Sequence, residues 1–432
     1  MTLPTIIPRS EHCVSRDNID ENALKVLYRL HKAGYRALLV GGGVRDLLLN
    51  HVPKDFDIAT DAHPDQVKKL FSNCRLIGRR FRLAHVFFGR EIIEVATFRS
   101  AHEGDESDGI QDDAGRILRD NVYGDIEGDV WRRDFTINAL YYDIADFSIV
   151  DYTGAMEDLK NRQLKLIGDA ETRYREDPVR MLRAVRFSAK LGLNIHAESE
   201  KYIYELGYLL ADIPPARLYE EVLKLFHSGQ AVICLELLRK YKLLQYLFAQ
   251  TSDCLEDQTF DDFIGYSLQS TDNRINEGKP ITPAFLFAAM LWKPVMMLNH
   301  QFLEEGLDTA MAMQNAMTAV IKQQIAKTSI PRRFSMVMRD IWHLQYRFKY
   351  RHGRRAKSLL AHHKFRAAYD LMCLRNKAGE LQDDSCEWWT RIQTMSSDQQ
   401  EKMLNPAKPS SRKKQRSEER RVGKECRARW GT

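Results

Sequence analysis

Residues 36–57 read RALLVGGGVRDLLLNHVPKDFD, and this stretch decides the fold. RALLV at 36–40 predicts a buried strand that runs into the glycine triplet Gly41–Gly43, after which VRDLLL resumes a helical pattern. Beyond Pro53, the alternation of KDFDIAT at 54–60 predicts a second strand. The order strand, glycine turn, helix and strand predicts an α/β unit with a small sheet.

Outward from that stretch, helical spacing predicts helices over 20–33 and 64–71, and strand-like runs cover 81–88 and 91–98. The segment 100–125 is rich in Gly, Asp, Glu and Ser, which predicts a long mobile loop. Nearly every segment of the C-terminal two-thirds shows helical periodicity. The predicted fold class is therefore α+β (mixed), with an N-terminal part built on a small mixed sheet and all-helical regions after it.

The composition fits a globular, cytoplasmic protein. Its 432 residues are 44% hydrophobic, which is enough for a substantial core. No run approaches the ~20 apolar residues of a membrane helix, and the N-terminus lacks the apolar stretch of a secretory signal. The seven cysteines are far apart and lack zinc-ligand spacing, so we expect them to be reduced.

The formal net charge of +6 is concentrated at the C-terminus. Residues 412–432 carry nine Lys or Arg against three Glu, so the preceding part of the chain is formally neutral. A basic tail after a neutral body is typical of a polyanion-binding arm. A solvated tail without a function gives the same pattern.

Asp55 and Asp57 form the candidate catalytic centre. On a strand, residues i and i+2 point to one face, so the two carboxylates converge while Phe56 is buried behind them. Neighbouring carboxylates repel each other unless a cation joins them, and Mg²⁺, which prefers oxygen ligands, is the natural occupant. Taken alone, an Asp-x-Asp pair also occurs as two solvated side chains.

The glycine-rich turn is a candidate phosphate site. Gly42 and Gly43 let backbone N–H groups approach a phosphate chain at the start of a helix, whose N-terminus favours anions. Arg45 can add a bidentate contact to a phosphate. The pattern is neither a GxxxxGK[ST] P-loop nor a GxGxxG dinucleotide turn, and a surface arginine beside a structural turn is the alternative.

The motif RRDFTIN at 132–138 gathers charged and amide side chains. Arg132 and Arg133 suit the oxygens of a triphosphate, while Asp134 and Asn138 can bond ribose hydroxyls or orient the arginines. Without its companion motifs, the same cluster would fit a local salt-bridge network.

EDPVRMLRAVRF at 176–187 has the start signals of a helix. Pro178 suits the first helical position, and Glu176 and Asp177 place negative charge at the helix N-terminus. Arginines at 180, 183 and 186 recur every three residues and line one face. On these residues alone, the segment fits a capped helix with a charged face.

GGGVRD, DFDIAT, RRDFTIN and EDPVR, in that order, resemble the motif set of the tRNA nucleotidyltransferase and bacterial poly(A) polymerase family. The resemblance covers about residues 20–350. It implies a nucleotidyltransferase head, a neck that reads the incoming base, and helical body and tail regions that hold RNA. The domains expected on this basis are an N-terminal extension (1–20), a catalytic head (21–155), a neck (156–230), a body (231–400) and a basic disordered tail (401–432).

The resemblance also implies a role for each matching residue. Asp55 and Asp57 match the metal-binding pair, with Mg²⁺ as the metal and Mn²⁺ as a substitute, in two-metal phosphoryl transfer. Glu94, in EIIEVATFR, resembles the third catalytic carboxylate, although a strand glutamate paired with Arg99 is the competing interpretation. Asp134 counts among the active-site acids. The matches assigned to nucleotide binding are Gly42, Gly43, Arg45, Arg132, Arg133, Asn138, Asp177, Arg180 and Arg183.

Within the neck, the family resemblance implies that Asp177 and Arg180 form an amino-acid template for the base edge, with Arg183 close to the nucleotide. IPPARLYEE at 213–221 resembles the polymerase version of the neck. There, Arg217 and Glu220 are expected to brace the template pair.

The segment LIGRRFRLAHVFFG at 76–89 resembles the signature that marks the poly(A) polymerases within the family, which implies ATP as the substrate. It places basic side chains beside the active sheet, where they would shape a pocket for adenine. A basic strand edge that touches RNA phosphates is the alternative. The candidates for adenine selectivity are Arg79, Arg80, Arg82 and His85.

Single-stranded RNA 3′ ends are the expected macromolecular partner. The stretch 330–355 interleaves Arg and Lys with aromatic residues, which suits single-stranded RNA. An amphipathic helix with its aromatics in the core is the alternative. RNA-decay or RNA-chaperone proteins are further candidate partners, and a monomer is the default oligomeric state.

Together, these observations predict template-independent polyadenylation of RNA. In this reaction AMP from ATP is added to an RNA 3′-hydroxyl and pyrophosphate is released. The expected role of the reaction is to promote RNA turnover. A CCA-adding tRNA nucleotidyltransferase is the first alternative, and use of CTP on a tRNA lacking its end would distinguish it. A catalytically inactive RNA-binding protein is the second, and the intact carboxylates and arginines argue against it.

Overall fold

The computed structural model describes residues 3–78, 82–100, 110, 111, 117–119 and 123–405. The chain divides into two compact units. The head-and-neck unit comprises Met1–Ala249, Ile275–Glu277 and Ile325–Ser329, and the C-terminal unit comprises Gln250–Arg274, Gly278–Gln324 and Ile330–Thr432. The division after Ala249 lies beyond the neck–body boundary at 230 expected from the sequence, because the next helices pack against the neck.

An eight-stranded mixed sheet forms the centre of the head. Its strand order is β1-β10-β9-β2-β3-β6-β5-β4, with β3 and β6 parallel and the other neighbouring pairs antiparallel. The strands are β1 Thr5–Ile7, β2 Ala37–Val40, β3 Asp57–Thr60, β4 Cys74–Ile77, β5 Leu83–Phe88, β6 Glu91–Thr97, β9 Leu140–Asp143 and β10 Ile149–Asp151. The α+β fold class is confirmed.

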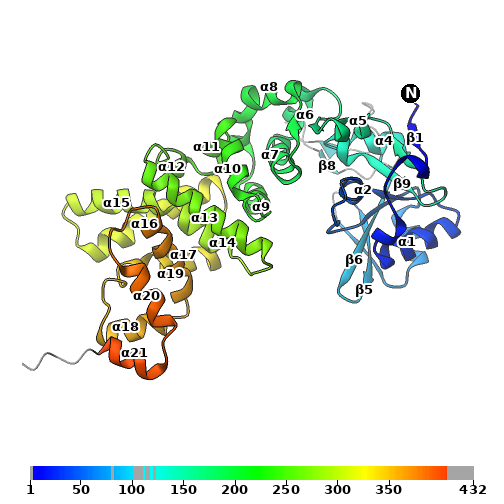
Figure 1. Cartoon of the computed structure of the whole chain (residues 1–432). Helices are drawn as coiled ribbons and strands as arrows, with labels where there is room; N and C mark the ends of the chain where they lie inside the picture. Colours follow the sequence, from blue (N-terminus) through cyan, green and yellow to red (C-terminus); the bar gives the residue numbers. More distant parts are fainter. Residues whose placement is uncertain (1–2, 79–81, 101–109, 112–116, 120–122, 406–432) are drawn as a thin grey trace, which may run out of the picture. The chain divides into compact units, whose positions relative to one another are not determined.

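Helices pack on this sheet (Figure 1). α1 contacts β2, β3 and β6, and Asp20 accepts the first backbone N–H groups of that helix, so the helix expected over 20–33 is confirmed. On β2, Leu38 and Val40 join a buried cluster with Ile126 and Val130 of α4. The head helices are α1 Glu21–Lys32, α2 Gly42–Leu48, α3 Pro64–Leu70 and α4 Ile126–Trp131, with short 3₁₀ turns at Arg9–Glu11, Arg16–Asn18 and Thr136–Asn138.

The strand expected over 54–60 begins only at Asp57. Val40, the last residue of β2, pairs with Asp57, and the chain then leaves the sheet at Gly41, whose φ is +74°. The residues before Asp57 therefore have no partner on β2, and Phe56 is half-buried rather than buried.

Two short antiparallel strands, β7 Ile110–Gln111 and β8 Ile117–Arg119, lie in the segment expected to be a long loop. The other residues between 101 and 122 lie outside the described residues. The predicted loop is thus interrupted by regular structure.

Helices make up most of the neck. EDPVR, expected as a helix start, is the junction between two helices, since α6 ends at Glu176, Asp177 is extended and α7 begins at Val179. The elements from neck to unit boundary are α5 Ala155–Lys160, β11 Gln163–Leu164, α6 Ala170–Glu176, α7 Val179–Leu191, β12 Asn194–Ile195, α8 Ala197–Leu206, a 3₁₀ turn Gly207–Asp212, α9 Pro215–Phe226, α10 Ala231–Lys240, α11 Leu244–Leu247 and α12 Ala249–Ser252.

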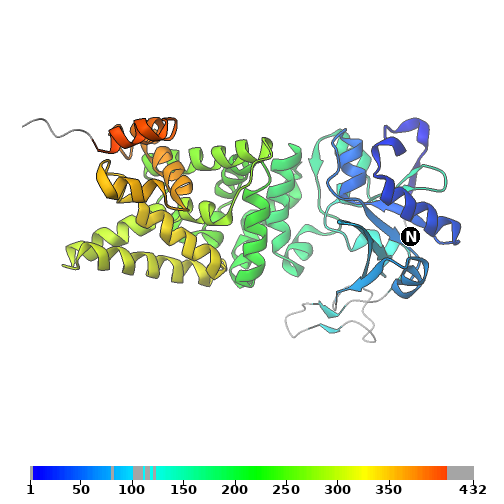
Figure 2. The ribbon, with the colours of Figure 1, turned by 90° about the horizontal axis from the view of Figure 1, so that it is seen from below.

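Helices account for the regular structure described in the C-terminal unit (Figure 2). Every helix in the described residues is too short or too polar to span a bilayer. The basic tail expected from 401 begins within a helix, and 406–432 lie outside the described residues. The helices are α13 Gln258–Asn276, α14 Pro283–Met290, α15 Trp292–Glu304, α16 Thr309–Lys327, α17 Arg332–Gln345, α18 Gly353–Leu360, α19 Phe365–Lys377, α20 Ser385–Gln393 and α21 Ser397–Leu404.

The aromatic stretch 330–355 belongs largely to the core of this unit. Trp342 is fully buried and donates its indole N–H to Ala288, while Phe348 packs edge-to-face on Trp389. Tyr350 is exposed, with cations near its ring. The core alternative therefore holds for Trp342 and Phe348, because the hydrophobic face of α17 and the turn after it need those rings for packing.

One expectation about the cysteines is wrong. Cys373 of α19 and Cys386 of α20 form a disulfide, although their positions in the sequence differ by 13. The two helices pack against each other and bring the Cα atoms within 5.0 Å, a proximity that sequence spacing does not reveal. Cys74 and Cys234 are buried free thiols, as expected of packing cysteines.

Candidate active site

Three candidate catalytic carboxylates lie near the edge of the head sheet at which β3 begins. Asp55 lies just before β3, and Asp57 is the first residue of that strand. The parallel register of β3 and β6 places Glu94 next to Asp57. Asp55, Asp57 and Glu94 are all exposed to solvent, so they can reach a ligand at this edge.

The surroundings of Asp57 alter its ionisation. Loss of hydration, together with the negative charges of Glu94 and Asp55, raises the pKa of Asp57 to about 6 from its ordinary value of 3.8. The positive charge of Arg133 works in the opposite direction without cancelling the shift. A cation placed among these carboxylates would remove the repulsion.

The carboxylates of Asp55, Asp57 and Glu94 are suitable ligands for a divalent metal ion. Oxygen ligands, exposed and mutually repelling, suit a hard cation such as Mg²⁺, which commonly uses one or two carboxylates plus waters and substrate phosphates. Within the described residues, no three His, Cys, Asp or Glu side chains are grouped so as to hold a metal unaided.

The glycine turn lies beside these acids because β2 ends opposite Asp57. A Cβ atom on Gly43 would stand 3.5 Å from the carbonyl oxygen of Asp55 and 3.8 Å from the Phe56 ring. A Cβ on Gly42 would stand 3.4 Å from the Arg45 guanidinium. These are ordinary contact distances, so the turn lies next to the loop of Asp55 and next to Arg45, and space alone does not require glycine at either position.

Arg45 is buried and bonded within the protein. Its Nε and Nη2 donate to Asp46 at 2.8 and 2.6 Å, and its Nη1 donates to Asn138 at 2.5 Å. The bidentate fork expected to clamp a phosphate is therefore occupied by Asp46. Lys190 of α7 lies 3.9 Å from the other oxygen of Asp46, so the turn is also tied to the neck.

Asp134 connects the head to the neck. Its Oδ1 accepts from Asn138 at 3.0 Å, and its Oδ2 accepts from Arg183 Nε of α7 at 2.7 Å. Burial works against its charge, but Arg183 and Asn138 outweigh burial and lower the pKa of Asp134. Both oxygens of Asp134 are thus bonded within the protein, whereas the acids at the sheet edge are Asp55, Asp57 and Glu94.

Arg133 has buried partners as well. Asp129 accepts from its Nε and Nη2 at 3.1 and 2.9 Å, and the Tyr141 hydroxyl accepts from its Nε at 2.9 Å. Burial disfavours its charge, but Tyr141 and Asp129 raise the pKa of Arg133. The guanidinium therefore braces the wall of the site.

Arg132 belongs to a cluster of cations. Burial, reinforced by the charges of Arg99 and Arg173, lowers the pKa of Arg132 to about 10. Its Nη1 donates to the carbonyl of Ser100 at 3.1 Å. Arg99 thus lies near Arg132, and Glu94 Oε1 is 3.4 Å from His85 Nε2. Such a concentration of positive charge suits a polyphosphate.

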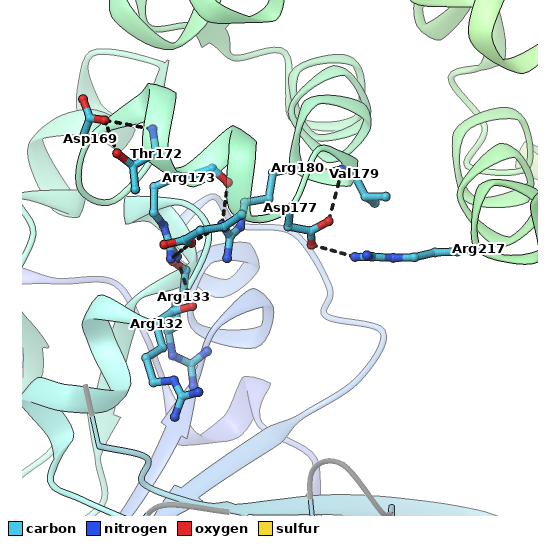
Figure 3. Close-up of polar contacts among 10 residues, drawn as sticks. Arg132, Arg133, Asp169, Thr172, Arg173, Asp177, Val179, Arg180 and Arg217 are labelled. Carbon is cyan, nitrogen blue, oxygen red and sulfur yellow. Dashed lines mark hydrogen bonds and ion pairs between the residues drawn. The ribbon is translucent and has the colours of Figure 1, made fainter. Parts of the chain in front are cut away.

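Arg173 of α6 links this cluster to the residues that follow. It donates to the carbonyls of Arg132 and Arg133, as Figure 3 shows. The backbone carbonyl of Arg173 in turn accepts from Arg180 Nη1 at 2.6 Å, and Arg180 also pairs with Glu176 at 2.8 Å. The base-reading candidate Arg180 is thereby held next to the arginine motif.

Asp177 sits opposite Arg217 in the same view (Figure 3). Arg217 Nη2 of α9 donates to Asp177 at 2.6 Å, and the backbone N–H of Val179 donates to Asp177 at 3.2 Å. Arg217 therefore contacts Asp177, one member of the predicted template pair. Glu220, expected to help it, is exposed, and the buried glutamate of α9 is Glu221.

The adenine-selectivity candidates separate in the structure. Arg79 and Arg80 lie outside the described residues. Arg82 lies 3.7 Å from Asp65, whereas His85 lies opposite Glu94 on the neighbouring strand. His85 contacts a catalytic candidate, since its Nε2 lies 3.4 Å from Glu94 Oε1.

Known proteins with this sequence pattern settle the family. Poly(A) polymerase I of Salmonella typhimurium is 53% identical over 411 residues, covering 93% of this chain and 88% of that protein. The protein of the same name from Haemophilus influenzae is 44% identical over 410 residues, covering 92% and 90%. The chain belongs to the poly(A) polymerase I family. It is a member of a family of nucleotidyltransferases.

Family profiles give the same answer for three parts of the chain. They match a Poly A polymerase head domain at 37–165, a probable RNA and SrmB-binding site of polymerase A at 192–255, and a polymerase A arginine-rich C-terminus at 305–422. A CCA-adding enzyme of Lactobacillus helveticus is 41% identical over 212 residues, which covers only 48% of this chain.

Solved structures show the fold. The CCA-adding enzyme of Bacillus stearothermophilus in complex with CTP has a TM-score of 0.57 at 24% identity, covering 86% of this chain and 82% of that one. The Thermotoga maritima CCA-adding enzyme in complex with tRNA has a TM-score of 0.56 at 19% identity, covering 90% and 85%. At such identities the likeness concerns architecture alone.

Sequence reasoning missed several residues of this poly(A) polymerase I family site. Asp129 precedes Arg133 by four residues, a spacing that places both on one side of a helical turn and could have indicated the pair. Asp46 follows Arg45 directly in GGGVRD, so the motif itself could have indicated this pair. By contrast, no local pattern links Tyr141 or Arg173 to the site, because each reaches it from a separate element.

We predict that Asp57→Asn abolishes nucleotidyl transfer and stabilises the metal-free protein at pH 7.5. A raised carboxyl pKa means that stability is lost as the pH rises from 3.8 through about 6, so removing the charge recovers it. Because Asp57 is exposed and screened by water, the gain should be only about 1 kcal/mol. Thermal unfolding in EDTA measures it.

The gain from Asp57→Asn should shrink at pH 5.0, where the native carboxyl is largely protonated. Asp212→Asn, a change of one exposed charge in the same unit, is the control and should leave stability unchanged. An equal gain at both pH values, or none at pH 7.5, would contradict the electrostatic interpretation.

We also predict that Asp134→Asn and Arg183→Met each lower stability by about 2 kcal/mol, because each leaves a buried partner uncompensated. The double variant should lose less than the sum of the two. The contribution of the pair is present at neutral pH and is lost as the pH falls through the lowered pKa of Asp134. Denaturant unfolding of the four proteins tests this, and strict additivity would contradict it.

Proposed function

We propose that this chain extends RNA 3′ ends by template-independent polyadenylation, joining AMP from ATP to the terminal hydroxyl and releasing pyrophosphate. The observation that carries the proposal is the acidic edge of Asp55, Asp57 and Glu94 beside a glycine turn and a cationic cluster, in a chain whose full-length relatives are poly(A) polymerases. The CCA-adding enzyme named above matches only about half of the chain, which makes that activity the weaker candidate.

Asp55 and Asp57 would hold Mg²⁺, with Mn²⁺ as a substitute, and Glu94 would complete the acidic edge. The metal would lower the pKa of the attacking 3′-hydroxyl and neutralise charge on the leaving pyrophosphate. The protein's own part is to present the carboxylates on neighbouring strands, where their orientation is set by the sheet. Arg132, in the cationic cluster, would orient the triphosphate.

The neck would select the base. Asp177 is an acceptor, Arg180 is a donor, and the two lie at the α6–α7 junction with their side chains held by Arg217 and Glu176. Together they could match the donor and acceptor groups on one edge of adenine. His85, in contact with Glu94, would help shape the pocket from the side of the sheet.

RNA would be held by regions outside the catalytic head. The match at 192–255 to a probable RNA and SrmB-binding site supports an RNA partner. On α17 and α18, exposed Arg332, Arg333 and Arg355 offer positive charge for RNA phosphates. A monomeric state and association with RNA-decay or RNA-chaperone proteins are further parts of this proposal.

The decisive assay supplies single nucleotides and Mg²⁺ to a labelled unstructured RNA and to a tRNA lacking its CCA end. We expect long ladders with ATP alone on the unstructured RNA. Addition of C, C and A that stops on the tRNA would instead indicate a CCA-adding enzyme. Retention of RNA without any addition would favour the inactive RNA-binding alternative.

Asp55→Ala should reduce the extension rate by at least about a hundredfold, because an essential metal ligand would be removed. The matched control is Asp61→Asn at the opposite end of β3, where the carboxylate accepts the backbone N–H of Arg36. The control should retain activity within about twofold. Full activity of Asp55→Ala in a protein free of host polymerase would overturn the assignment.

A further inference from the structure

Phe187 of α7 is surrounded by arginines from both the head and the neck. Its ring centroid lies 5.2 Å from the guanidinium carbon of Arg45, 5.3 Å from that of Arg183 and 4.6 Å from that of Arg186. The side chain is 7% exposed. One largely buried ring therefore contacts three cations.

The same ring also joins the arginine motif. Phe135, the residue after Asp134, packs edge-to-face on Phe187 with centroids 5.7 Å apart. Phe187 thus contacts the glycine-turn helix through Arg45 and the RRDFTIN segment through Phe135. Its own backbone belongs to the neck helix.

Like charges gathered in this way repel each other, and the structure compensates them unequally. Asp46 and Asn138 bond Arg45, and Asp134 bonds Arg183. Arg186 is different, since its buried Nε has no hydrogen-bond partner among the described residues. Burial and the charge of Arg183 lower the pKa of Arg186. Besides the negative charges of Glu221 and Asp134, the electron-rich face of the Phe187 ring offers this group a favourable interaction.

We propose that Phe187 is a positioning residue for ATP, fixing the guanidiniums of Arg45 and Arg183 relative to each other across the head–neck junction. This inference rests on the proposed function, in which the glycine turn holds phosphates and α7 approaches the base. Without the ring, the carboxylate bonds still hold each arginine from one side. The distance between the glycine turn and α7 is then less well defined. ATP should therefore bind in more than one position between them.

The test compares Phe187→Leu and Phe187→Tyr with wild type in the full chain. Equilibrium binding of Mg²⁺-ATP and steady-state extension of unstructured RNA are measured together. We expect Phe187→Leu to weaken ATP binding and raise KM for ATP about tenfold, with little change in KM for RNA. Phe187→Tyr keeps the ring and should stay within about twofold of wild type.

Phe226→Leu is the matched control for packing. Phe226 is a fully buried ring of α9 that packs edge-to-face on Phe248, outside the arginine cluster. It should lower Tm about as much as Phe187→Leu while leaving KM for ATP unchanged. Should Phe187→Leu fail to fold, Phe187→Met fills more of the volume without a ring, and the same rise in KM is expected.

The proposal is overturned if Phe187→Leu or Phe187→Met loses only stability and keeps wild-type affinity for ATP. It is equally overturned if Phe226→Leu raises KM for ATP to the same extent, or if Phe187→Tyr behaves like Phe187→Leu. Wild type that binds ATP but never extends RNA would contradict the proposed function instead. The binding comparison would then still decide the role of Phe187.

Discussion

The ion pair between Asp134 and Arg183 is the contact on which the rest of the active site depends. Through Asn138, Asp134 also reaches Arg45, so charge-assisted hydrogen bonds run without interruption from the glycine turn to the neck helix. Charges this deeply placed are tolerable only because each has a partner, and loss of one would leave another uncompensated. The position of the glycine turn and the position of α7 are therefore set together.

The parts of the fold that the sequence predicted are those governed by local pattern. The strand before Gly41, the helix capped by Asp20 and the helical C-terminal part all follow from periodicity and turn chemistry. The start of β3 at Asp57 was not predictable in this way, because it depends on where β2 ends opposite it. The disulfide between Cys373 and Cys386 likewise depends on how two helices pack.

For the site, motif order predicted which groups gather but not which partner each group takes. Arg45 and Arg133 were expected to face phosphates, and each instead bonds a carboxylate of the protein. Glu220 and Glu221 lie three and four positions after Arg217, so helical spacing alone does not choose between them, and only their burial differs. By contrast, no sequence pattern near Arg173 indicates that its side chain donates to the carbonyls of Arg132 and Arg133.

Two groups of like charge stand near each other in the head, and their pKa values move in opposite directions. Asp57 shifts upward among acids, whereas Arg132 shifts downward among arginines, so each moves toward its neutral form. Neither group can satisfy the other fully, because sheet and helix backbones fix them on separate elements. A ligand that carries a divalent cation and a polyphosphate together would relieve both repulsions at once. The strain in the free protein is thus matched to a metal–nucleotide complex rather than to either component alone.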